Sequence, residues 1–333
     1  MSKAQENPSR EFAGRARSRS PSVGFFAPSG FLPDPTVIDR AAQCFAERGW
    51  RVSAGDSVFA REQRFAGSDE LRACELQRFA TDRNLSVAIS ARGGYGLSRL
   101  LERFDFDAIA GAGVALVGYS DFTVVNLALL AGTGAVSFQG PAASDFAAAV
   151  EGGKDATAPG AREAAQFTVG HFFAAMSNDP YEVRFAATVD GADALDVSGR
   201  LWGGNLAMIC SLLGTPYFPK VRGGILFIED VNEPVYRIER MMLQLHHAGV
   251  LAQQKAIVLG EFAPIVPMPN DEGYDLAAAW AAVRARCEVP FVHGLPFGHG
   301  RRRLTLAVGA RSRLAVNAGM ARLQFSGHPT IEA

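Results

Sequence analysis

Three short segments of the chain carry side chains that could together activate an alcohol. An apolar run at residues 114–117 leads into a tight turn that presents Ser120. A strand-to-helix turn of this kind holds a hydroxyl out of the packed sheet, and the N–H of the following Asp121 can face a developing oxyanion. Later in the chain, Glu229 ends a second apolar run and His299 stands between two glycines. The order along the chain is therefore nucleophile, acid, base.

These assignments have plainer alternatives. A serine that follows a strand is also a common N-cap of the next helix. The turn departs from the G-x-S-x-G pattern of α/β-hydrolases, because Phe122 stands where the second glycine belongs. Asp230 and Glu233 compete with Glu229 for the role of the acid, and Asp230 could instead cap the helix that follows it. We take Ser120 and Glu229 as the candidates.

A glycine-rich segment, Arg92-Gly93-Gly94-Tyr95-Gly96, follows a predicted strand. Its glycines let main-chain N–H groups approach a ligand closely. It lacks the G-x-G-x-x-G spacing and the lysine of a phosphate-binding loop. We expect the N–H groups of Gly94 and Asp121 to form an oxyanion hole, with a plain glycine turn as the alternative.

Histidine spacing does not indicate a metal site. His246 and His247 lie near the end of a helical stretch, where they suit the helix dipole, and we interpret them as structural. No H-E-x-x-H or other ligand spacing supports a bound zinc ion. Neither a metal nor a cofactor is expected.

Short apolar runs alternate with amphipathic stretches from residue 22 to 141, a pattern typical of βαβ units around a parallel sheet. Strands are expected at 23–27, 51–53, 86–91, 114–118 and 135–138, and helices at 36–48, 68–79 and 122–130. Sites in such sheets form at the carboxyl ends of the strands. The segments Pro28-Ser29-Gly30, 92–96 and 118–121 should therefore converge.

The second half mixes helices and strands of both hydrophobic periods, which predicts a mixed sheet or partial barrel. Helices are expected at 205–213, 234–247 and 275–287, and strands at 225–229, 256–259, 305–308 and 322–325. The predicted fold is α/β, with an N-terminal flavodoxin-like parallel sheet, a C-terminal mixed β/α domain and the active site in the interdomain cleft. The expected division is a leader (1–20), an N-terminal domain with the nucleophile (21–145), a connecting segment (146–190) and a C-terminal domain with acid and base (191–333).

Composition indicates an ordinary globular protein, and a length of 333 residues favours two domains. Hydrophobic residues make up 48 % and charged residues 20 %, enough for a substantial core. The 33 basic and 34 acidic side chains nearly cancel, so no strong field is available to hold nucleic acid or an anionic membrane. No run approaches the roughly eighteen apolar residues of a membrane span.

The cysteines and the N-terminus indicate a reducing compartment. Residues 1–20 are polar, rich in Arg and Ser, and lack the apolar core of a secretory signal. We expect a disordered leader on a cytoplasmic protein; a transit peptide is the alternative, which Glu6 and Glu11 disfavour. The cysteines lack the close pairs of metal or redox sites and are expected to be buried thiols. They are Cys44, Cys74, Cys210 and Cys287.

Taken together, these segments resemble the LD-carboxypeptidase family of serine peptidases over nearly the whole chain from about Gly24 onward. The most specific matches are Gly-Arg-Leu-Trp-Gly-Gly-Asn-Leu at 199–206, Leu-Gly-Thr-Pro at 213–216, Phe-Ile-Glu-Asp-Val at 227–231, Arg-Met-Met-Leu-Gln-Leu at 240–245 and Gly298-His299. The resemblance implies a Ser-Glu-His triad at Ser120, Glu229 and His299, with the nucleophile on the N-terminal domain and the other two residues on the C-terminal domain.

The resemblance further implies a cytoplasmic enzyme of murein recycling that forms a homodimer. Its substrate would be the murein tetrapeptide L-Ala-D-Glu-meso-diaminopimelate-D-Ala, from which it removes the terminal D-Ala. The sequence leaves open whether the third residue is diaminopimelate or lysine. Candidate substrate contacts are Arg92, Gly93, Tyr95, Asn205 and Arg301, and a cation among Arg92 and Arg301-Arg302-Arg303 would anchor the terminal carboxylate. The chain departs from many relatives at Gln139, where they carry His or Ser, and in the density of the basic run at 301–303.

Two other functions compete with this one. A hydrolase of the same superfamily that cleaves an acyl-sulfamoyl or aminoacyl-nucleotide antibiotic would share the triad. It would need an aromatic platform for a nucleobase, which the Ala- and Gly-rich stretch 142–160 does not offer. A non-catalytic muropeptide-binding module would have no need for the three side chains together.

Overall fold

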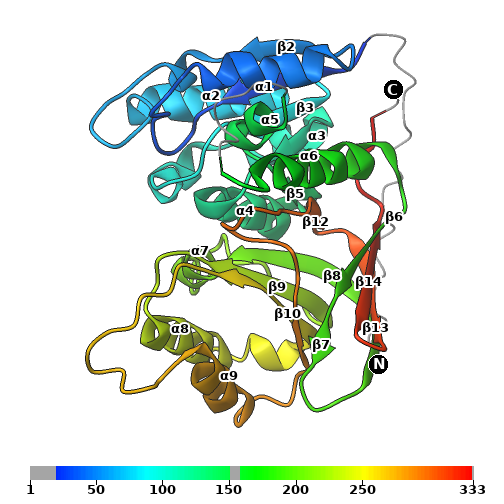
Figure 1. The fold of residues 1–333 in the computed structure, drawn as a ribbon. Coiled ribbons are helices and arrows are strands. Elements are labelled where there is room, and N and C mark those ends of the chain that lie inside the picture. Colours follow the sequence, from blue (N-terminus) through cyan, green and yellow to red (C-terminus); the bar gives the residue numbers. More distant parts are fainter. Residues whose placement is uncertain (1–19, 151–157, 332–333) are drawn as a thin grey trace, which may run out of the picture.

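The computed structural model describes residues 20–150 and 158–331, so the leader expected over 1–20 lies outside the described residues except for Ser20. The described residues form two β-sheets, one above the other in Figure 1, each accompanied by helices. A continuous set of buried apolar side chains extends through both. None of the helices in the described ranges is both long and apolar enough to cross a bilayer.

The upper sheet has six strands in the order β12-β5-β4-β3-β1-β2. Five of them are parallel: β1 (Ser22–Phe26), β2 (Arg51–Ala54), β3 (Val87–Ser90), β4 (Ala115–Val117) and β5 (Ser137–Gln139). The helices between them are α1 (Val37–Ala46), α2 (Asp69–Thr81), α3 (Phe106–Ala112) and α4 (Thr123–Thr133). The order 2-1-3-4-5 is that of flavodoxin-like folds, which confirms the predicted class of the N-terminal sheet.

Local sequence explains most of these elements. β1, β3 and β4 are buried along their whole length, as near-continuous apolar runs are when helices cover both faces of a parallel sheet. α2 begins after Ser68, whose hydroxyl accepts a hydrogen bond from the N–H of Leu71 at 3.2 Å. α3, with only seven residues, is too short to give a clear helical period and was not predicted.

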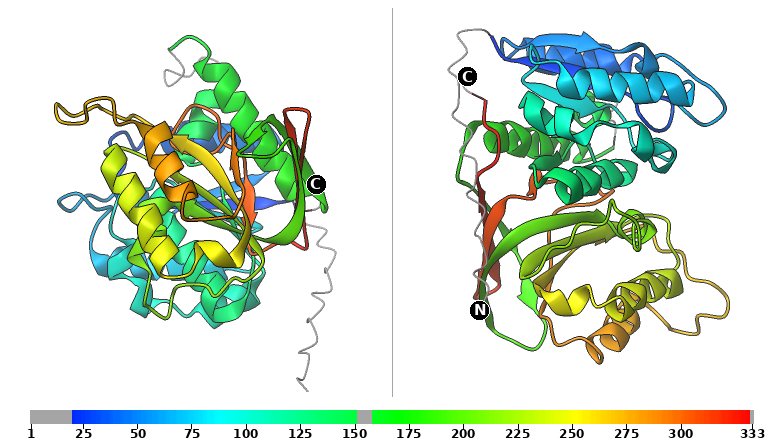
Figure 2. Two further views of the ribbon diagram at one scale, coloured as in Figure 1. Left: turned by 90° about the horizontal axis from the view of Figure 1, so that it is seen from below. Right: turned by 180° about the vertical axis from the view of Figure 1, so that it is seen from behind.

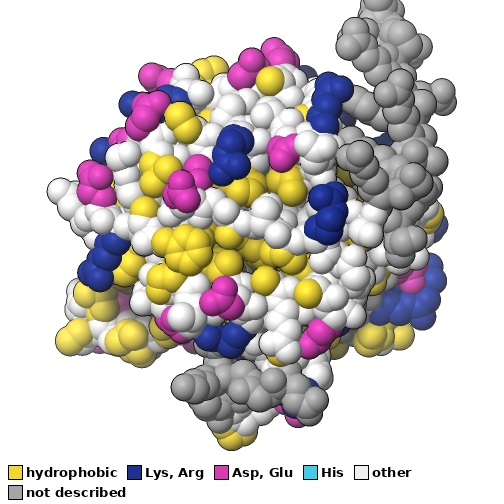
Figure 3. All heavy atoms as spheres, turned by 90° about the horizontal axis from the view of Figure 1, so that it is seen from above, with side chains coloured by type: hydrophobic (Ala, Val, Ile, Leu, Met, Phe, Trp, Pro, Cys, Tyr) yellow, Lys and Arg dark blue, Asp and Glu magenta, His cyan; other side chains and the backbone are white. Residues whose placement is uncertain are grey.

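The upper sheet ends at β2, an edge strand whose residues are mostly exposed. Seen from above, this side of the molecule carries hydrophobic side chains gathered across its middle and charged side chains around them (Figure 3). Within the described residues, β2 pairs with β1 alone, and β1 and β3 separate it from β4.

The lower sheet has eight strands in the order β6-β14-β13-β8-β9-β10-β11-β7. β8 (Ala194–Asn205), β9 (Gly224–Asp230), β10 (Gln254–Phe262) and β11 (Phe291–His293) are parallel. The antiparallel strands are β6 (Tyr181–Ala186), β7 (Thr188–Val189), β13 (Arg311–Asn317) and β14 (Met320–Ser326). Its helices are α7 (Leu206–Ser211), α8 (Val235–His247) and α9 (Leu276–Arg284). The predicted mixed sheet is confirmed.

The long strand β8 forms an antiparallel pair with one neighbour and a parallel pair with the other. Its first part, 194–200, pairs with β13 and alternates between less and more exposed residues, whereas 201–205 pairs with β9 and is buried throughout. Seen from behind, β13 and β14 run along one side of the lower layer, beside the first part of β8 (Figure 2). The sequence pattern did not predict β6, β7, β8, β11 or β13.

Two segments differ from the predicted division. Within the predicted connecting segment 146–190, α6 (Ala161–Ser177) packs with α5 (Ala143–Ala149) on the upper layer, where Phe172 contacts Phe45 and Phe146. The strand β12 (Leu306–Val308), expected in the C-terminal domain, pairs antiparallel with β5 and so completes the upper sheet. The chain thus returns to the first sheet near its C-terminus.

Candidate active site

Ser120 lies where β4 gives way to α4. After β4 the chain makes a short 3₁₀ turn, Ser120–Phe122, and then enters α4. Ser120 adopts a positive φ of 62°, a backbone conformation that residues with a side chain rarely take. Such conformations cluster at functional sites, where the surrounding structure holds them in place. The expected strand–turn–helix presentation of the serine is therefore present, with strain at the serine itself.

Two glycines make room for this turn. A Cβ at Gly93 would lie 2.8 Å from Cβ and 3.1 Å from Oγ of Ser120, so a side chain there would press directly on the hydroxyl. A Cβ at Gly118 would lie 2.5 Å from the ring of Phe122. The glycine-rich segment after β3 thus forms the wall against which Ser120 rests.

Asp121 ties the neighbouring loops together. Its carboxylate is buried, and Oδ2 accepts hydrogen bonds from the Ser29 hydroxyl at 2.7 Å and the Leu97 N–H at 3.0 Å. Burial raises the pKa of this carboxyl. The N–H of Gly30 donates to the carbonyl of Gly93 at 3.1 Å. The loops at the ends of β1, β3 and β4 therefore converge, as the sequence predicted.

Glu229 stands near the end of β9, and its side chain is fully buried. Its Oε2 lies 2.7 Å from Nδ1 of His299, and its Oε1 accepts a hydrogen bond from Nδ2 of Asn205 at 3.2 Å. Asn205 ends the neighbouring strand β8 in register with Glu229. A buried carboxylate needs such partners, since an unpaired one would be costly.

His299 connects the acid to the serine. Its Nε2 lies 3.0 Å from Oγ of Ser120, so the three side chains form one hydrogen-bonded chain from the lower half of the molecule to the upper half. Because an ionised carboxylate can only accept, Nδ1 carries the proton of a neutral imidazole and Nε2 is left to accept from the serine hydroxyl. This arrangement can remove a proton from the serine as it attacks an electrophile.

The loop that carries His299 is fastened by Arg303. Nε of Arg303 donates to the carbonyl of Gly298 at 2.9 Å, and Nη1 pairs with Asp145 on α5 at 2.5 Å. The guanidinium lies 3.8 Å from the ring centroid of Tyr119, whose ring is 5.2 Å from that of His299. One buried arginine thus links the histidine loop to the layer that holds Ser120.

The other predicted site residues are not members of the hydrogen-bonded chain of Glu229, His299 and Ser120, and they differ in how exposed they are. Gly94 has a φ of 117° and packs against Gly30. A Cβ at Gly94 would lie 3.2 Å from the backbone nitrogen of Gly30. Arg92 donates to the carbonyl of Phe31, and Tyr95 is 42 % exposed and lies beside Phe65. Arg301 is exposed and donates to the carbonyl of Pro159 at 2.6 Å. His246 and His247 occupy the last turn of α8, as predicted.

Asn205, a predicted substrate contact, is buried, and its amide donates to Glu229 and Asp230 while Oδ1 accepts from the N–H of Met208. Two other interpretations need correction. The alternative in which Asp230 caps the helix that follows it is not observed; its Oδ2 accepts from the N–H of Ala207 at 2.9 Å, in the first turn of α7. Cys74 was expected to be buried, but it lies on the exposed side of α2, whereas the other three cysteines are buried.

Neither Glu261 nor Arg303 was singled out from the sequence as a residue next to the catalytic candidates. Glu261 lies near the end of β10, next to β9, and the apolar run before it is the same signal that pointed to Glu229. Burial raises the pKa of Glu261. Arg303 was treated as one of three equivalent arginines, although it alone is buried.

Within the described ranges, no group of three or more His, Cys, Asp and Glu side chains is arranged to hold a metal ion.

The family models for the LD-carboxypeptidase N-terminal domain and C-terminal domain match residues 23–140 and 198–314, respectively. The chain belongs to the LD-carboxypeptidase family. Ser120 falls within the first matched range, and both Glu229 and His299 fall within the second.

Individual LD-carboxypeptidases are similar along most of the chain. The murein tetrapeptide carboxypeptidase of Pseudomonas aeruginosa is 29 % identical over 84 % of this chain and 88 % of its own. The crystal structure of muramoyltetrapeptide carboxypeptidase from Oxalobacter formigenes is 40 % identical, covers 93 % of this chain and 100 % of its own, and superposes with a TM-score of 0.82. The family assignment and these relatives make the protein a hydrolase of the carboxypeptidase type.

A second group of solved structures shares only the fold. The microcin C7 self-immunity protein, in a complex with aspartyl sulfamoyl adenosine, has a TM-score of 0.79 over 95 % of this chain and 98 % of its own, but is 21 % identical. A carboxypeptidase and a microcin self-immunity protein thus share this two-layer architecture.

Proposed function

We propose that this protein is a serine LD-carboxypeptidase that removes the terminal D-alanine from the murein tetrapeptide L-Ala-D-Glu-meso-diaminopimelate-D-Ala. The observation that carries the proposal is the hydrogen-bonded chain from Glu229 through His299 to Ser120, with contacts of 2.7 Å and 3.0 Å. The names of the similar carboxypeptidases support the choice of a murein peptide as substrate. We place the reaction in the cytoplasm, in peptidoglycan recycling, and expect a homodimer.

In the proposed reaction, His299 takes the hydroxyl proton of Ser120 as the serine oxygen attacks the carbonyl of the diaminopimelate residue. Glu229 holds the imidazole and stabilises its cationic form. His299 then gives the proton to the departing amine of D-alanine, and an ester between Ser120 and the tripeptide remains. Water, deprotonated by the same imidazole, cleaves this ester and releases the tripeptide.

The tetrahedral intermediate needs donors for its negative oxygen. We assign this role to the main-chain N–H groups of Asp121, which follows Ser120 in the turn, and of Gly94, which follows Gly93. The contact between Gly93 and Ser120 supports the assignment, because it brings the glycine-rich segment against the nucleophile. Each donor in such a site is typically worth about 3 kcal/mol of barrier.

A carboxypeptidase must also bind the free carboxylate of its substrate. We assign this role to Arg92, whose partly buried guanidinium is hydrogen-bonded to the carbonyl of Phe31 and is close enough to influence Tyr119 electrostatically. A cation in a partly dry cleft binds a carboxylate more strongly than one in water does. We expect Arg92→Ala to raise KM for the tetrapeptide, and an unchanged KM would contradict the assignment.

Free murein tetrapeptide is the direct test of the function. Incubation with the protein should release one alanine, detected as the tripeptide by mass spectrometry, and Ser120→Ala should abolish the release. The exposed Ser211 on α7 supplies a matched control, since Ser211→Ala should leave turnover intact. An aminoacyl sulfamoyl nucleotide is offered in parallel. Cleavage of the nucleotide without loss of alanine from the tetrapeptide would favour the competing hydrolase, and binding of the tetrapeptide without cleavage would favour a muropeptide-binding module.

A further inference from the structure

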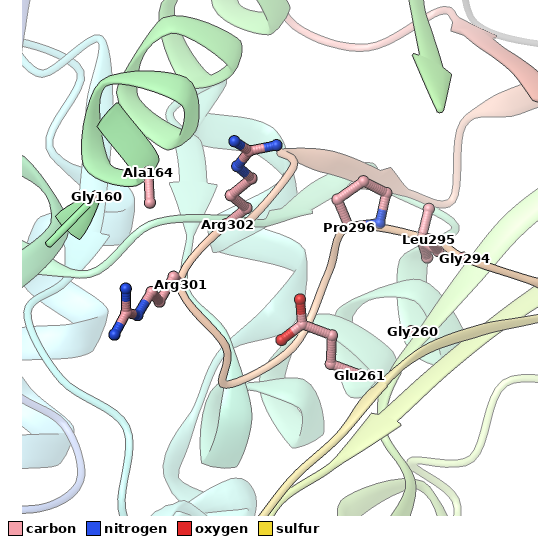
Figure 4. A pocket seen from close by; sticks show the side chains of 9 residues that line it. All are labelled: Gly160, Ala164, Gly260, Glu261, Gly294, Leu295, Pro296, Arg301 and Arg302. Carbon is pink, nitrogen blue, oxygen red and sulfur yellow. The ribbon is translucent and has the colours of Figure 1, made fainter. Parts of the chain in front are cut away.

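A cavity of about 670 Å³ lies beside the loop that carries His299. Glu261 at the end of β10, Pro296, and Arg301 and Arg302 line one side of it, and Ala164 at the start of α6 lines the other. Figure 4 shows Arg301 and Arg302 projecting in different directions from the same loop, with Arg302 pointing up toward the helices and the Glu261 carboxylate beside the bend of the loop. None of these residues belongs to the hydrogen-bonded chain of Ser120, His299 and Glu229.

The cavity and the histidine share a wall. A Cβ at Gly300 would lie 1.4 Å from Oε2 of Glu261, and a Cβ at Gly298 would lie 3.0 Å from Cβ of Glu261 and 3.3 Å from Cβ of Glu229. Glu261 therefore packs against both glycines that flank His299. A group bound at Glu261 would lie directly next to the proposed base.

The charges that line the cavity are of both signs. Glu261 supplies a half-buried carboxylate, while Arg301 and Arg302 are exposed and make no ion pair with a carboxylate within the described ranges. Arg301 is held by its hydrogen bond to the carbonyl of Pro159, and Arg302 lies 5.5 Å from the ring of Phe167. A ligand that satisfies all three groups must carry a negative and a positive charge within a short distance of each other.

We propose that this cavity binds the side chain of the diaminopimelate residue, with its ammonium group at Glu261 and its distal carboxylate at Arg301 and Arg302. The inference rests on the proposed function. The residue whose carbonyl is attacked must project its side chain beside the nucleophile and the base. Among the candidate third residues only diaminopimelate ends in an amino-acid head group; lysine ends in an ammonium alone. The carboxylates of D-alanine and D-glutamate need only a cation, and Glu261 would repel them.

Two tetrapeptides that differ only at the third residue, diaminopimelate or lysine, test this proposal. We expect the wild type to prefer the diaminopimelate peptide by about 100-fold in kcat/KM, since charge-assisted hydrogen bonds to two arginines are lost with lysine. The double variant Arg301→Gln/Arg302→Gln should lose most of this preference by slowing the diaminopimelate peptide alone. Glu261→Gln should slow both peptides, because both carry the ammonium. Arg286→Gln, at an exposed arginine that donates to the carbonyl of Ala282, is the matched control and should change neither.

The outcomes separate the two proposals. Equal kcat/KM for both peptides in the wild type, or equal losses for both in the double arginine variant, would overturn the assignment of the cavity while leaving the carboxypeptidase activity in place. If neither peptide loses alanine, the proposed function fails. The cavity is then tested by calorimetry on Ser120→Ala, where tighter binding of the diaminopimelate peptide supports it and equal or absent binding contradicts it.

Discussion

The two ends of the hydrogen-bonded chain are held in different ways. Ser120 is placed by the backbone: a strained residue at φ 62° rests against Gly93, on a turn between a buried strand and a helix. Glu229 and His299 are placed by side chains, through Asn205 behind the acid and Arg303 beneath the histidine loop. The nucleophile should therefore be sensitive to the volume of its neighbours, and the acid–base pair to their polarity and charge.

The largest effect is expected at the acid. Glu229→Gln keeps the shape of the side chain but presents an amide to Nδ1 of His299, which favours the wrong tautomer or breaks the bond. We expect kcat to fall about 10⁴-fold in an assay of D-alanine release. Asp230→Asn, which removes the neighbouring buried carboxylate, is the matched control, and its kcat should change less than about tenfold. Comparable losses in the two variants would mean that Glu229 has no special part in catalysis.

Steric pressure on the nucleophile should come next. Gly93→Ala places a methyl group 2.8 Å from Cβ of Ser120, and Gly93 does not have the positive φ that would itself strain an alanine. Ser120 must then shift by several tenths of an ångström, and we expect kcat/KM to fall about 100-fold. The control is Gly111→Ala in α3, where a methyl group meets nothing within 4 Å. Full activity in Gly93→Ala would show that the contact does not set the position of the hydroxyl.

A change of charge without a change of volume probes the acid–base pair. Asn205→Asp still caps α7 through its oxygen, but it replaces the donor to Glu229 with a like charge. We expect a loss of about tenfold in kcat, together with a shift of the acid limb of the pH–rate profile to higher pH, because the added charge stabilises the protonated imidazole. A purely structural role for Asn205 would leave the profile where it is.

Asp230 provides the smallest effect, on stability rather than on rate. Burial raises its pKa from 3.8 to about 6, so the folded protein binds this proton more readily than the unfolded chain does between those values. The free energy of unfolding of the wild type, compared with that of Asp230→Asn, should therefore increase as the pH falls from about 7 to 4, by at most about 3 kcal/mol. Urea unfolding of both proteins across this range measures the difference, and a difference that does not vary with pH would contradict the assigned origin of the shift.

Local sequence made Ser120, Glu229 and His299 candidates, and the resemblance to the LD-carboxypeptidases grouped them as one triad. Ser120 and Glu229 each follow an apolar run that ends abruptly in a polar residue, and His299 is marked by its glycines. Glu261 follows a similar run but was missed, because its place depends on the order β8-β9-β10 and on a register shift between Leu259 and Phe262. Neither of these can be read from a local pattern.

Long-range pairing explains the other differences between prediction and structure. The contact between Asn205 and Glu229 was not predicted, because it depends on the parallel register of β8 and β9. β12 has only three residues and pairs with β5, in the other sheet from β11 and β13, which precede and follow it in sequence. Arg303 could be distinguished from Arg301 and Arg302 only once Asp145 and Gly298 were placed beside it. Short strands and paired charges of this kind are specified by the assembled fold.

Cooperation between Ser120 and His299 is tested most directly by a double-mutant cycle on the release of D-alanine. Residues that act as one unit are strongly non-additive, since the loss of either removes the contribution of both. We predict that Ser120→Ala and His299→Ala each reduce kcat to a similar residual value and that the double variant is no slower than either. Losses that multiply in the double variant, or a Ser120→Ala protein that retains turnover, would contradict a shared role for the two side chains.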